Sequence, residues 1–148
     1  MTPETITIDE SGMTFGPYPS GHCFHIEKSA LYTNIRQGVK MAEFLLLHAD
    51  SDRPAMLWVV EAKSSSPQPK NEPDFSQFIM EVRGKWINAL ALVLASRLGR
   101  HRQAGTDLPG SFKTFDLSRF DVRFVLVING HPKKWLPPIQ DALQKSLR

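Results

Sequence analysis

Apolar runs of strand length mark two neighbouring segments in the first half of the chain. Residues 40–48 and 56–63 are both rich in Leu, Val and Met, and Ser51-Asp52-Arg53-Pro54 between them has the composition of a turn. A third run, at 120–128, is almost continuously apolar, which is typical of a strand covered on both faces. The pattern predicts an antiparallel hairpin followed, much later in the chain, by a buried strand.

Helical spacing accounts for the apolar residues that follow the hairpin. A long helix is predicted from Asp74 to about Arg100, with Asp74 or Ser76 as its N-cap. Its apolar stripe consists of Ile79, Val82, Trp86, Leu90 and Val93. Shorter helices are predicted at 24–35 and 139–147.

Glycine and proline mark the predicted connections. Ile6-Thr7-Ile8 reads as a short strand, and the Gly- and Pro-rich segment after it, up to residue 22, reads as turns. Residues 64–73 and 103–119 read as irregular loops. The order strand, helix, hairpin, helix, strand, helix predicts a single α/β domain over 1–148 with a mixed central sheet.

Composition sets limits on the class of protein. A chain of 148 residues with 41% hydrophobic residues is long enough to bury a core as one domain. Cys23, the single cysteine, forms no internal disulfide, so a cytoplasmic location is expected. The apolar runs fall far short of a membrane span, and neither membrane association nor secretion is expected.

The hairpin pattern brings two acidic residues together. Centring the hairpin on Asp52 places Glu43 opposite Glu61, about 5 Å apart at Cβ. The apolar neighbours then pair Leu45 with Val59 and Leu47 with Leu57. A slip of one residue would send Glu43 to the other face. Two carboxylates this close repel unless a cation joins them, and oxygen ligands are those that Mg²⁺ prefers.

Lys63 lies two residues after Glu61 and therefore shares its face of the strand. This arrangement resembles the signature of the PD-(D/E)xK nuclease superfamily, which has an acid on one strand of a hairpin and (D/E)xK on the next. Glu61-Ala62-Lys63 matches the second half, whereas Glu43 stands where Asp is usual and Ala42 where Pro is expected. The resemblance covers roughly residues 24–130.

The resemblance implies a restriction-endonuclease-like fold, a three-layer α/β/α core with a mixed central sheet. It implies a metal-dependent endodeoxyribonuclease whose catalytic residues are Glu43, Glu61 and Lys63. Glu43, Glu61 and the Ala62 carbonyl would bind Mg²⁺ or Mn²⁺, and Lys63 would orient water or stabilise the phosphate. DNA is expected rather than RNA, because most members of the superfamily act on DNA.

Auxiliary residues are expected on the neighbouring helices. Gln77, Glu81 and Lys85 lie along one flank of the long helix, where nucleases of this superfamily often carry a polar site residue. Glu27 lies on the predicted preceding helix, where related enzymes sometimes place an acid. The alternative is an exposed Glu81–Lys85 pair and a solvated Glu27.

Basic residues cluster in two groups, within a chain of formal net charge +3. The nucleic-acid-binding candidates are Arg97, Arg100, Arg102, Lys133 and Lys134. Cations at the end of a helix also complement its dipole, which is an alternative explanation for the arginines. A nuclease of this length is expected to form a homodimer or to act with a targeting subunit.

Other chemistries find less support in the sequence. It contains no GxxxxGK[ST] loop, no GxGxxG after a strand and no GxSxG elbow. His22 and His25 flank Cys23, a short cluster of transition-metal ligand types. The main alternative function is a non-catalytic nuclease-fold accessory module that binds nucleic acid or a protein partner. A third alternative keeps the α/β fold, with Glu61 and Lys63 merely solvated at a strand end.

Overall fold

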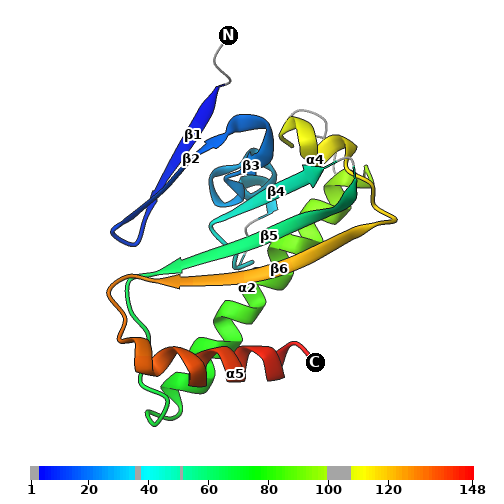
Figure 1. Cartoon of the computed structure of the whole chain (residues 1–148). Coiled ribbons are helices and arrows are strands. Elements are labelled where there is room, and N and C mark those ends of the chain that lie inside the picture. Colours follow the sequence, from blue (N-terminus) through cyan, green and yellow to red (C-terminus); the bar gives the residue numbers. More distant parts are fainter. Residues whose placement is uncertain (1–3, 36–37, 51, 100–107) are drawn as a thin grey trace.

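The computed structural model describes residues 4–35, 38–50, 52–99 and 108–148 (Figure 1). The strands are β1 (Thr5–Glu10), β2 (Met13–Pro19), β3 (Cys23–Phe24), β4 (Phe44–Asp50), β5 (Arg53–Lys63) and β6 (Phe120–Ile128). The α-helices are α1 (Ala30–Ile35), α2 (Asp74–Arg97), α4 (Gly110–Thr114) and α5 (Leu136–Ser146). Short 3₁₀ turns are η1 (Ser20–His22), η2 (Ile26–Lys28) and η3 (Lys133–Trp135).

The central sheet has four strands in the order β3-β4-β5-β6. β4 is antiparallel to both β3 and β5, whereas β6 runs parallel to β5. A parallel neighbour needs a long crossover connection, and α2 lies within it. The predicted α/β class with a mixed sheet is confirmed.

The predicted register of the β4–β5 hairpin is also confirmed. Leu45 pairs with Val59 and Leu47 with Leu57, and all four side chains are buried. β4 begins at Phe44 rather than at residue 40, but the Glu43 amide still donates to the Val60 carbonyl at 3.0 Å. Glu43 is therefore attached to β5 beside Glu61, although the paired residues begin at Phe44 and Val60.

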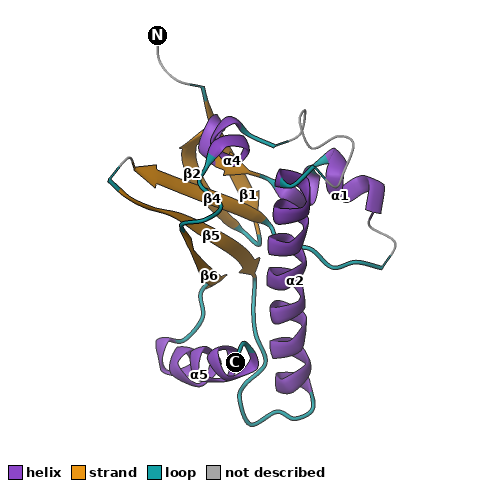
Figure 2. Cartoon of the chain, turned by 90° about the vertical axis from the view of Figure 1, so that its right-hand side faces the viewer, coloured by secondary structure: helices purple, strands orange, loops and turns teal. Residues whose placement is uncertain are grey.

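Among the described helices, α1, α2, α4 and α5 all contribute to the core on one face of the sheet (Figure 2). Trp86 of α2 stacks on Phe124 of β6 at 5.2 Å and donates to the Val125 carbonyl at 3.2 Å. α5 adds Ile139 and Leu143, which are buried in the same core. In the described segments, no helix is both long and apolar enough to span a membrane.

The opposite face of the sheet carries a second cluster of buried residues beneath the β1–β2 hairpin. Phe15 and Tyr18 of β2 lie 5.3 Å and 5.9 Å from Phe44 of β4, measured between ring centroids. The Gly- and Pro-rich segment after Ile8, up to residue 22, was expected to form only turns. This expectation is wrong, because packing of its aromatic side chains outweighs the preference of Gly16 and Pro17 for turns. The covering layer here is a β-hairpin, whereas α/β/α layering had been expected.

Four local expectations also differ from the structure. The helix predicted over 24–35 is divided into β3, η2 and α1, since Phe24 pairs with Leu45 of β4. β6 lies at the edge of the sheet and its residues are half-buried or exposed, so it is not covered on both faces. Neither Asp74 nor Ser76 caps α2; Glu72 instead accepts a hydrogen bond from Ser76 Oγ at 2.9 Å. α4 forms within the predicted loop at 103–119.

Cys23 gives a simple test of the second cluster. Its side chain is 2% exposed, and burial raises the pKa of the thiol to about 12. Because the thiolate is the reactive form, we expect iodoacetamide at pH 8 to alkylate the folded protein at least about a hundredfold more slowly than the urea-unfolded chain. Mass spectrometry of timed samples measures both rates, and equal rates would contradict this packing.

Candidate functional site

The two acids predicted at the end of the hairpin are both buried. Glu61 of β5 is 0% exposed and Glu43, immediately before β4, is 7% exposed. Burying a carboxylate is costly unless charges or hydrogen bonds compensate it. The alternative in which Glu61 is simply solvated at a strand end is therefore wrong.

Two lysines compensate the charge of Glu61. Lys85 Nζ, from α2, lies 2.7 Å from Glu61 Oε2, and Lys63 Nζ lies 3.6 Å from the same oxygen. Burial raises the pKa of Glu61, and the two lysines oppose that rise. Burial lowers the pKa of Lys85, but the hydrogen bond to Glu61, together with the charges of Glu61 and Glu43, outweighs burial and raises the pKa.

Glu43 has a different environment, dominated by other acids. Burial, followed by a hydrogen bond with Glu27 and the charges of Glu27, Glu61 and Glu10, raises the pKa of Glu43 to about 9. Glu43 Oε2 is buried and has no hydrogen-bond partner among the described residues. Within the same part of the chain, no lysine or arginine forms an ion pair with Glu10, Glu27 or Glu43. Negative charge is therefore in excess on this side of the site.

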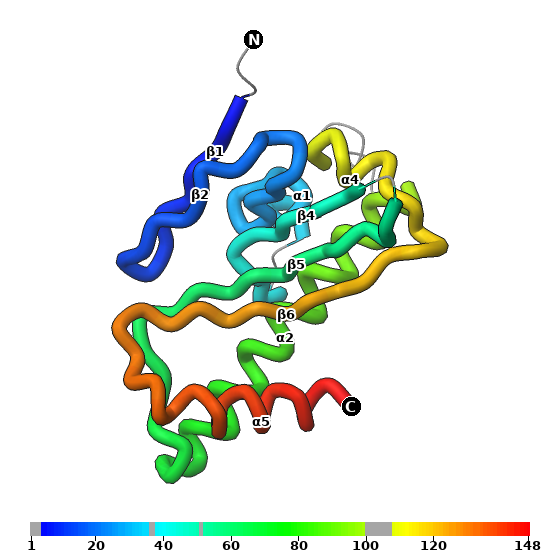
Figure 3. The backbone as a smooth tube through the Cα atoms, viewed as in Figure 1, coloured from blue at the N-terminus to red at the C-terminus, as the bar shows by residue number. Residues whose placement is uncertain are grey.

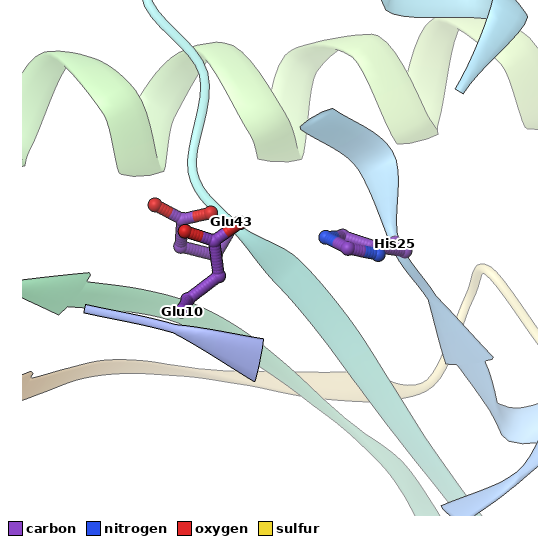
Figure 4. Close-up of side chains that lie close together, drawn as sticks. All are labelled: Glu10, His25 and Glu43. Atoms are coloured by element: carbon purple, nitrogen blue, oxygen red, sulfur yellow. The ribbon is translucent and has the colours of Figure 1, made fainter. Parts of the chain in front are cut away.

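Glu10 and His25 lie beside Glu43 (Figure 4). One ligand atom from each of the three side chains lies within 4.8 Å of the other two. Burial lowers the pKa of His25, which favours the neutral imidazole that binds metals. Sequence reasoning missed Glu10, because only the packing of β1 on the sheet brings it to Glu43.

His22, Cys23 and His25, which are neighbours in the sequence, have separate environments in the structure. The His22 ring lies 2.9 Å from Ser111 Oγ of α4, and Cys23 packs in the cluster beneath the β1–β2 hairpin. β3 ends at Phe24, so His25 lies outside the strand that holds Cys23. Only His25 of the three reaches Glu43.

The Ala62 carbonyl, an expected metal ligand, already has a protein partner. Ser11 Oγ, at the turn between β1 and β2, donates to it at 3.1 Å. Asn129 Nδ2, just after β6, donates to the Ser11 carbonyl at 3.1 Å. Gly12 follows with φ +75°, and a Cβ there would meet Asn129 Nδ2 at 2.8 Å. These contacts fix the hairpin turn against the ends of β5 and β6.

Two of the auxiliary candidates interact with the buried acids, and two have their contacts elsewhere. Lys85 and Glu27 interact with Glu61 and Glu43 respectively. Glu81 pairs with Lys40 at 3.2 Å rather than with Lys85, and this contact lowers the pKa of Glu81. Gln77 is exposed and hydrogen-bonds to Glu81.

The basic candidates lie at different ends of the molecule. Lys133 and Lys134 are exposed in η3, which follows β6 (Figure 3). The last residue of β6, Ile128, pairs with Lys63 of β5, so η3 follows the Lys63 end of the sheet. Arg97 lies twelve residues, about 18 Å, along α2 from Lys85. Its guanidinium donates to the Phe115 carbonyl at 2.7 Å and lies over the Phe115 ring, which is a structural contact. Arg100 and Arg102 lie outside the described residues.

Comparison of the chain with protein-family models, characterised proteins and solved structures finds no match. The function therefore has to be inferred from the site itself.

Glu43 predicts an unusual effect on stability. Its pKa rises from 4.5 in the unfolded chain to about 9 in the folded protein, so the folded state binds the proton more tightly. The resulting stabilisation is fully present below pH 4.5 and is lost as pH rises toward about 9. In EDTA, Glu43→Gln is therefore expected to raise the free energy of unfolding by about 1–3 kcal/mol at pH 8 and to leave it unchanged near pH 4.5.

Urea unfolding at both pH values measures this difference. Glu4→Gln is the matched control, because Glu4 is exposed just before β1. An identical pH dependence of stability in wild type and Glu43→Gln would contradict the assigned environment of Glu43.

Proposed function

We propose that the protein is a metal-dependent nuclease that hydrolyses phosphodiester bonds of DNA. The observation that carries this proposal is the proximity of two buried acids, Glu43 and Glu61, at the end of the β4–β5 hairpin, with Lys63 3.6 Å from Glu61. The order of hairpin, α2 and parallel β6 is consistent with a restriction-endonuclease-like core. A buried acidic pair beside a lysine has no evident role in stability, since burial penalises both acids.

The carboxylates provide oxygen ligands for a divalent ion. Glu43 Oε2 and Glu61 Oε1 are buried, and neither has a hydrogen-bond partner among the described residues. These atoms would hold Mg²⁺ or Mn²⁺, which would polarise the scissile phosphate and lower the pKa of a bound water. Serving as such a ligand would explain why both acids occupy so costly an environment.

The two lysines have separate roles. The Lys63 side chain is 23% exposed, so its charge is accessible to substrate and would stabilise the negative charge that develops on the phosphate. The Lys85 side chain is 21% exposed and contacts Glu61 at 2.7 Å. Lys85 is therefore a positioning residue, which holds Glu61 in place beneath the reacting group.

Contacts with DNA would extend from the same end of the sheet. Lys63 is the last residue of β5 and Lys133 follows the adjacent end of the parallel strand β6. The Lys63 carbonyl accepts a hydrogen bond from the Asn129 amide at 2.9 Å. Lys133 and Lys134 would contact backbone phosphates there, independently of base sequence. A chain of 148 residues offers limited surface for recognising a long site, so a homodimer or targeting subunit would extend the contact.

The test is a cleavage assay with purified protein. Supercoiled, linear and single-stranded DNA, and RNA, are each incubated with Mg²⁺, Mn²⁺ or EDTA, using wild type and Glu61→Gln. We expect the wild type to cut DNA only with metal, and Glu61→Gln to be inactive while retaining the wild-type circular dichroism spectrum. Failure of folded wild type to cut any substrate would overturn the proposal, as would equal activity in the variant.

A further inference from the structure

We infer that Glu10, His25 and Glu43 form a binding site for a divalent first-row transition-metal ion, which bridges the β1–β2 hairpin to the edge of the central sheet. This deepens the proposed function and partly rests on it, because Glu43 belongs to both sites. It adds a nitrogen ligand and an acid from outside the hairpin that carries Glu61 and Lys63. Metal binding can be measured without any cleavage.

The geometry supplies three ligands from three separate segments. Glu10 ends β1, His25 lies between β3 and η2, and Glu43 precedes β4. Their candidate ligand atoms all lie within 4.8 Å of one another, a spacing that one ion can bridge after small side-chain movements (Figure 4). The three residues are up to 33 positions apart in sequence, and the fold alone brings them together.

A second, independent observation is a pair of buried polar atoms aimed into this cluster. Glu43 is 7% exposed, and its Oε2 has no hydrogen-bond partner in the described part of the chain. His25 Nε2 is likewise buried and unpartnered there. Such atoms are rare in folded proteins because each loses its hydrogen bonds to water. One metal ion would satisfy both.

Charge points to the same position. Glu61 already has Lys85 and Lys63 beside it, whereas Glu43 faces Glu10 and Glu27. Among the described residues, both lysines form their ion pairs with Glu61, and none forms one with Glu43 or Glu10. A divalent cation between Glu10 and Glu43 would remove the repulsion there.

The ligand types indicate which ion would bind. Carboxylates suit Mg²⁺ and Mn²⁺ alike, but an imidazole nitrogen favours a transition metal over Mg²⁺. Mn²⁺ is therefore the probe of choice, with Mg²⁺ as the competitor. The structural consequence concerns the hairpin, since Glu10 directly precedes Ser11, which bonds to the Ala62 carbonyl. An ion held by Glu10 would add a second attachment of the hairpin to the sheet.

The experiment is titration of metal-free, full-length protein with Mn²⁺, following the electron paramagnetic resonance signal of the free ion. Wild type is compared with Glu10→Gln, His25→Gln and the exposed control Glu4→Gln. We expect Glu10→Gln and His25→Gln each to weaken Mn²⁺ binding at least about tenfold, and Glu4→Gln to match wild type. In wild type, displacement of Mn²⁺ should require at least about tenfold more Mg²⁺, and His25→Gln should reduce that preference.

A measurement on wild type alone protects the test against misfolded variants. Bound Mn²⁺ broadens nearby amide signals in a nuclear magnetic resonance spectrum, so signals around Glu10 and His25 should disappear before those around Arg53, at the opposite end of β5 from Glu61. Uniform broadening, or variants that bind Mn²⁺ as Glu4→Gln does, would overturn the inference.

The outcomes separate this inference from the proposed nuclease activity. If the protein cleaves DNA with metal but Mn²⁺ binding is unchanged in Glu10→Gln and His25→Gln, the inference is overturned and the nuclease proposal is supported. Mn²⁺ binding that requires Glu10 and His25, without cleavage of any substrate, supports the inference and overturns the proposed activity.

Discussion

Lys63→Met is expected to reduce the rate of DNA cleavage about a hundred- to a thousandfold, the usual effect of removing one preorganised charge from a reaction centre. Lys63 Nζ lies 3.6 Å from Glu61 Oε2 and its side chain remains 23% exposed, so the charge can reach a phosphate beside the acids. Methionine keeps much of the side-chain length and removes the charge. Single-turnover cleavage of supercoiled plasmid at saturating metal measures the effect on the chemical step.

Lys113→Met is the control for loss of a lysine elsewhere. Lys113 is exposed on α4, which packs on η1 beside the C-terminal end of β4, away from the Lys63 end of β5 (Figure 1). The cleavage rate of Lys113→Met should match that of wild type. Equal rates for Lys63→Met and Lys113→Met would remove Lys63 from the proposed chemistry.

Lys85→Met is expected to have the largest effect on stability. Lys85 is the nearest counter-ion of Glu61, whose side chain is 0% exposed, and the two lie 2.7 Å apart. Removing one partner of a buried pair leaves an uncompensated charge, so we expect the free energy of unfolding to fall by about 3 kcal/mol. This is the lower end of the usual range, because Lys63 remains beside Glu61.

The double variant Lys85→Met/Glu61→Gln separates charge from packing. It removes both partners and should recover at least half of the lost stability in urea unfolding. Lys145→Met breaks an exposed pair with Asp141 at 3.1 Å and should change stability little. A loss in Lys85→Met that Glu61→Gln fails to relieve would mean that packing, rather than the ion pair, makes Lys85 important.

The parts of the site that sequence reasoning found depend on short-range regularities. Pairing across a hairpin follows from the position of its turn, and centring the turn on Asp52 gave the correct partners from Phe44–Val60 to His48–Met56, next to Glu43 and Glu61. The spacing along α2 brought Lys85 forward as an auxiliary residue, and it contacts Glu61. Both predictions require only local geometry: the pairing of two adjacent strands and the spacing of residues along one helix.

The parts that sequence reasoning missed depend on long-range packing. β2 contains Gly16 and Pro17, whose local preference is for turns, yet burial of Phe15 against Phe44 makes the segment a strand. Because that strand was missed, Glu10 was not placed beside Glu43. His25 was assigned to a helix, since the pairing of β3 with β4 depends on residues about twenty positions away. Tertiary contacts outweighed local preference in each case.

The placement of basic residues shows the same limit. Clustering in the sequence grouped Arg97 with the cations that follow it, but Arg97 bonds to Phe115 at the far end of α2 from Lys85. Lys133 and Lys134 follow β6 and come to the Lys63 end because β5 and β6 are parallel. Which cations lie near the acids depends on strand direction, which charge spacing does not encode.

The most direct test of the nuclease site compares plasmid cleavage by wild type and Glu43→Gln, with and without a divalent metal. The variant is informative because its fold is expected to be at least as stable as wild type at pH 8, so lost activity cannot be attributed to unfolding. We predict metal-dependent cutting by wild type and at least about a thousandfold less by Glu43→Gln. Equal cutting by the two proteins, or none by folded wild type with Mg²⁺ or Mn²⁺, would contradict the assignment.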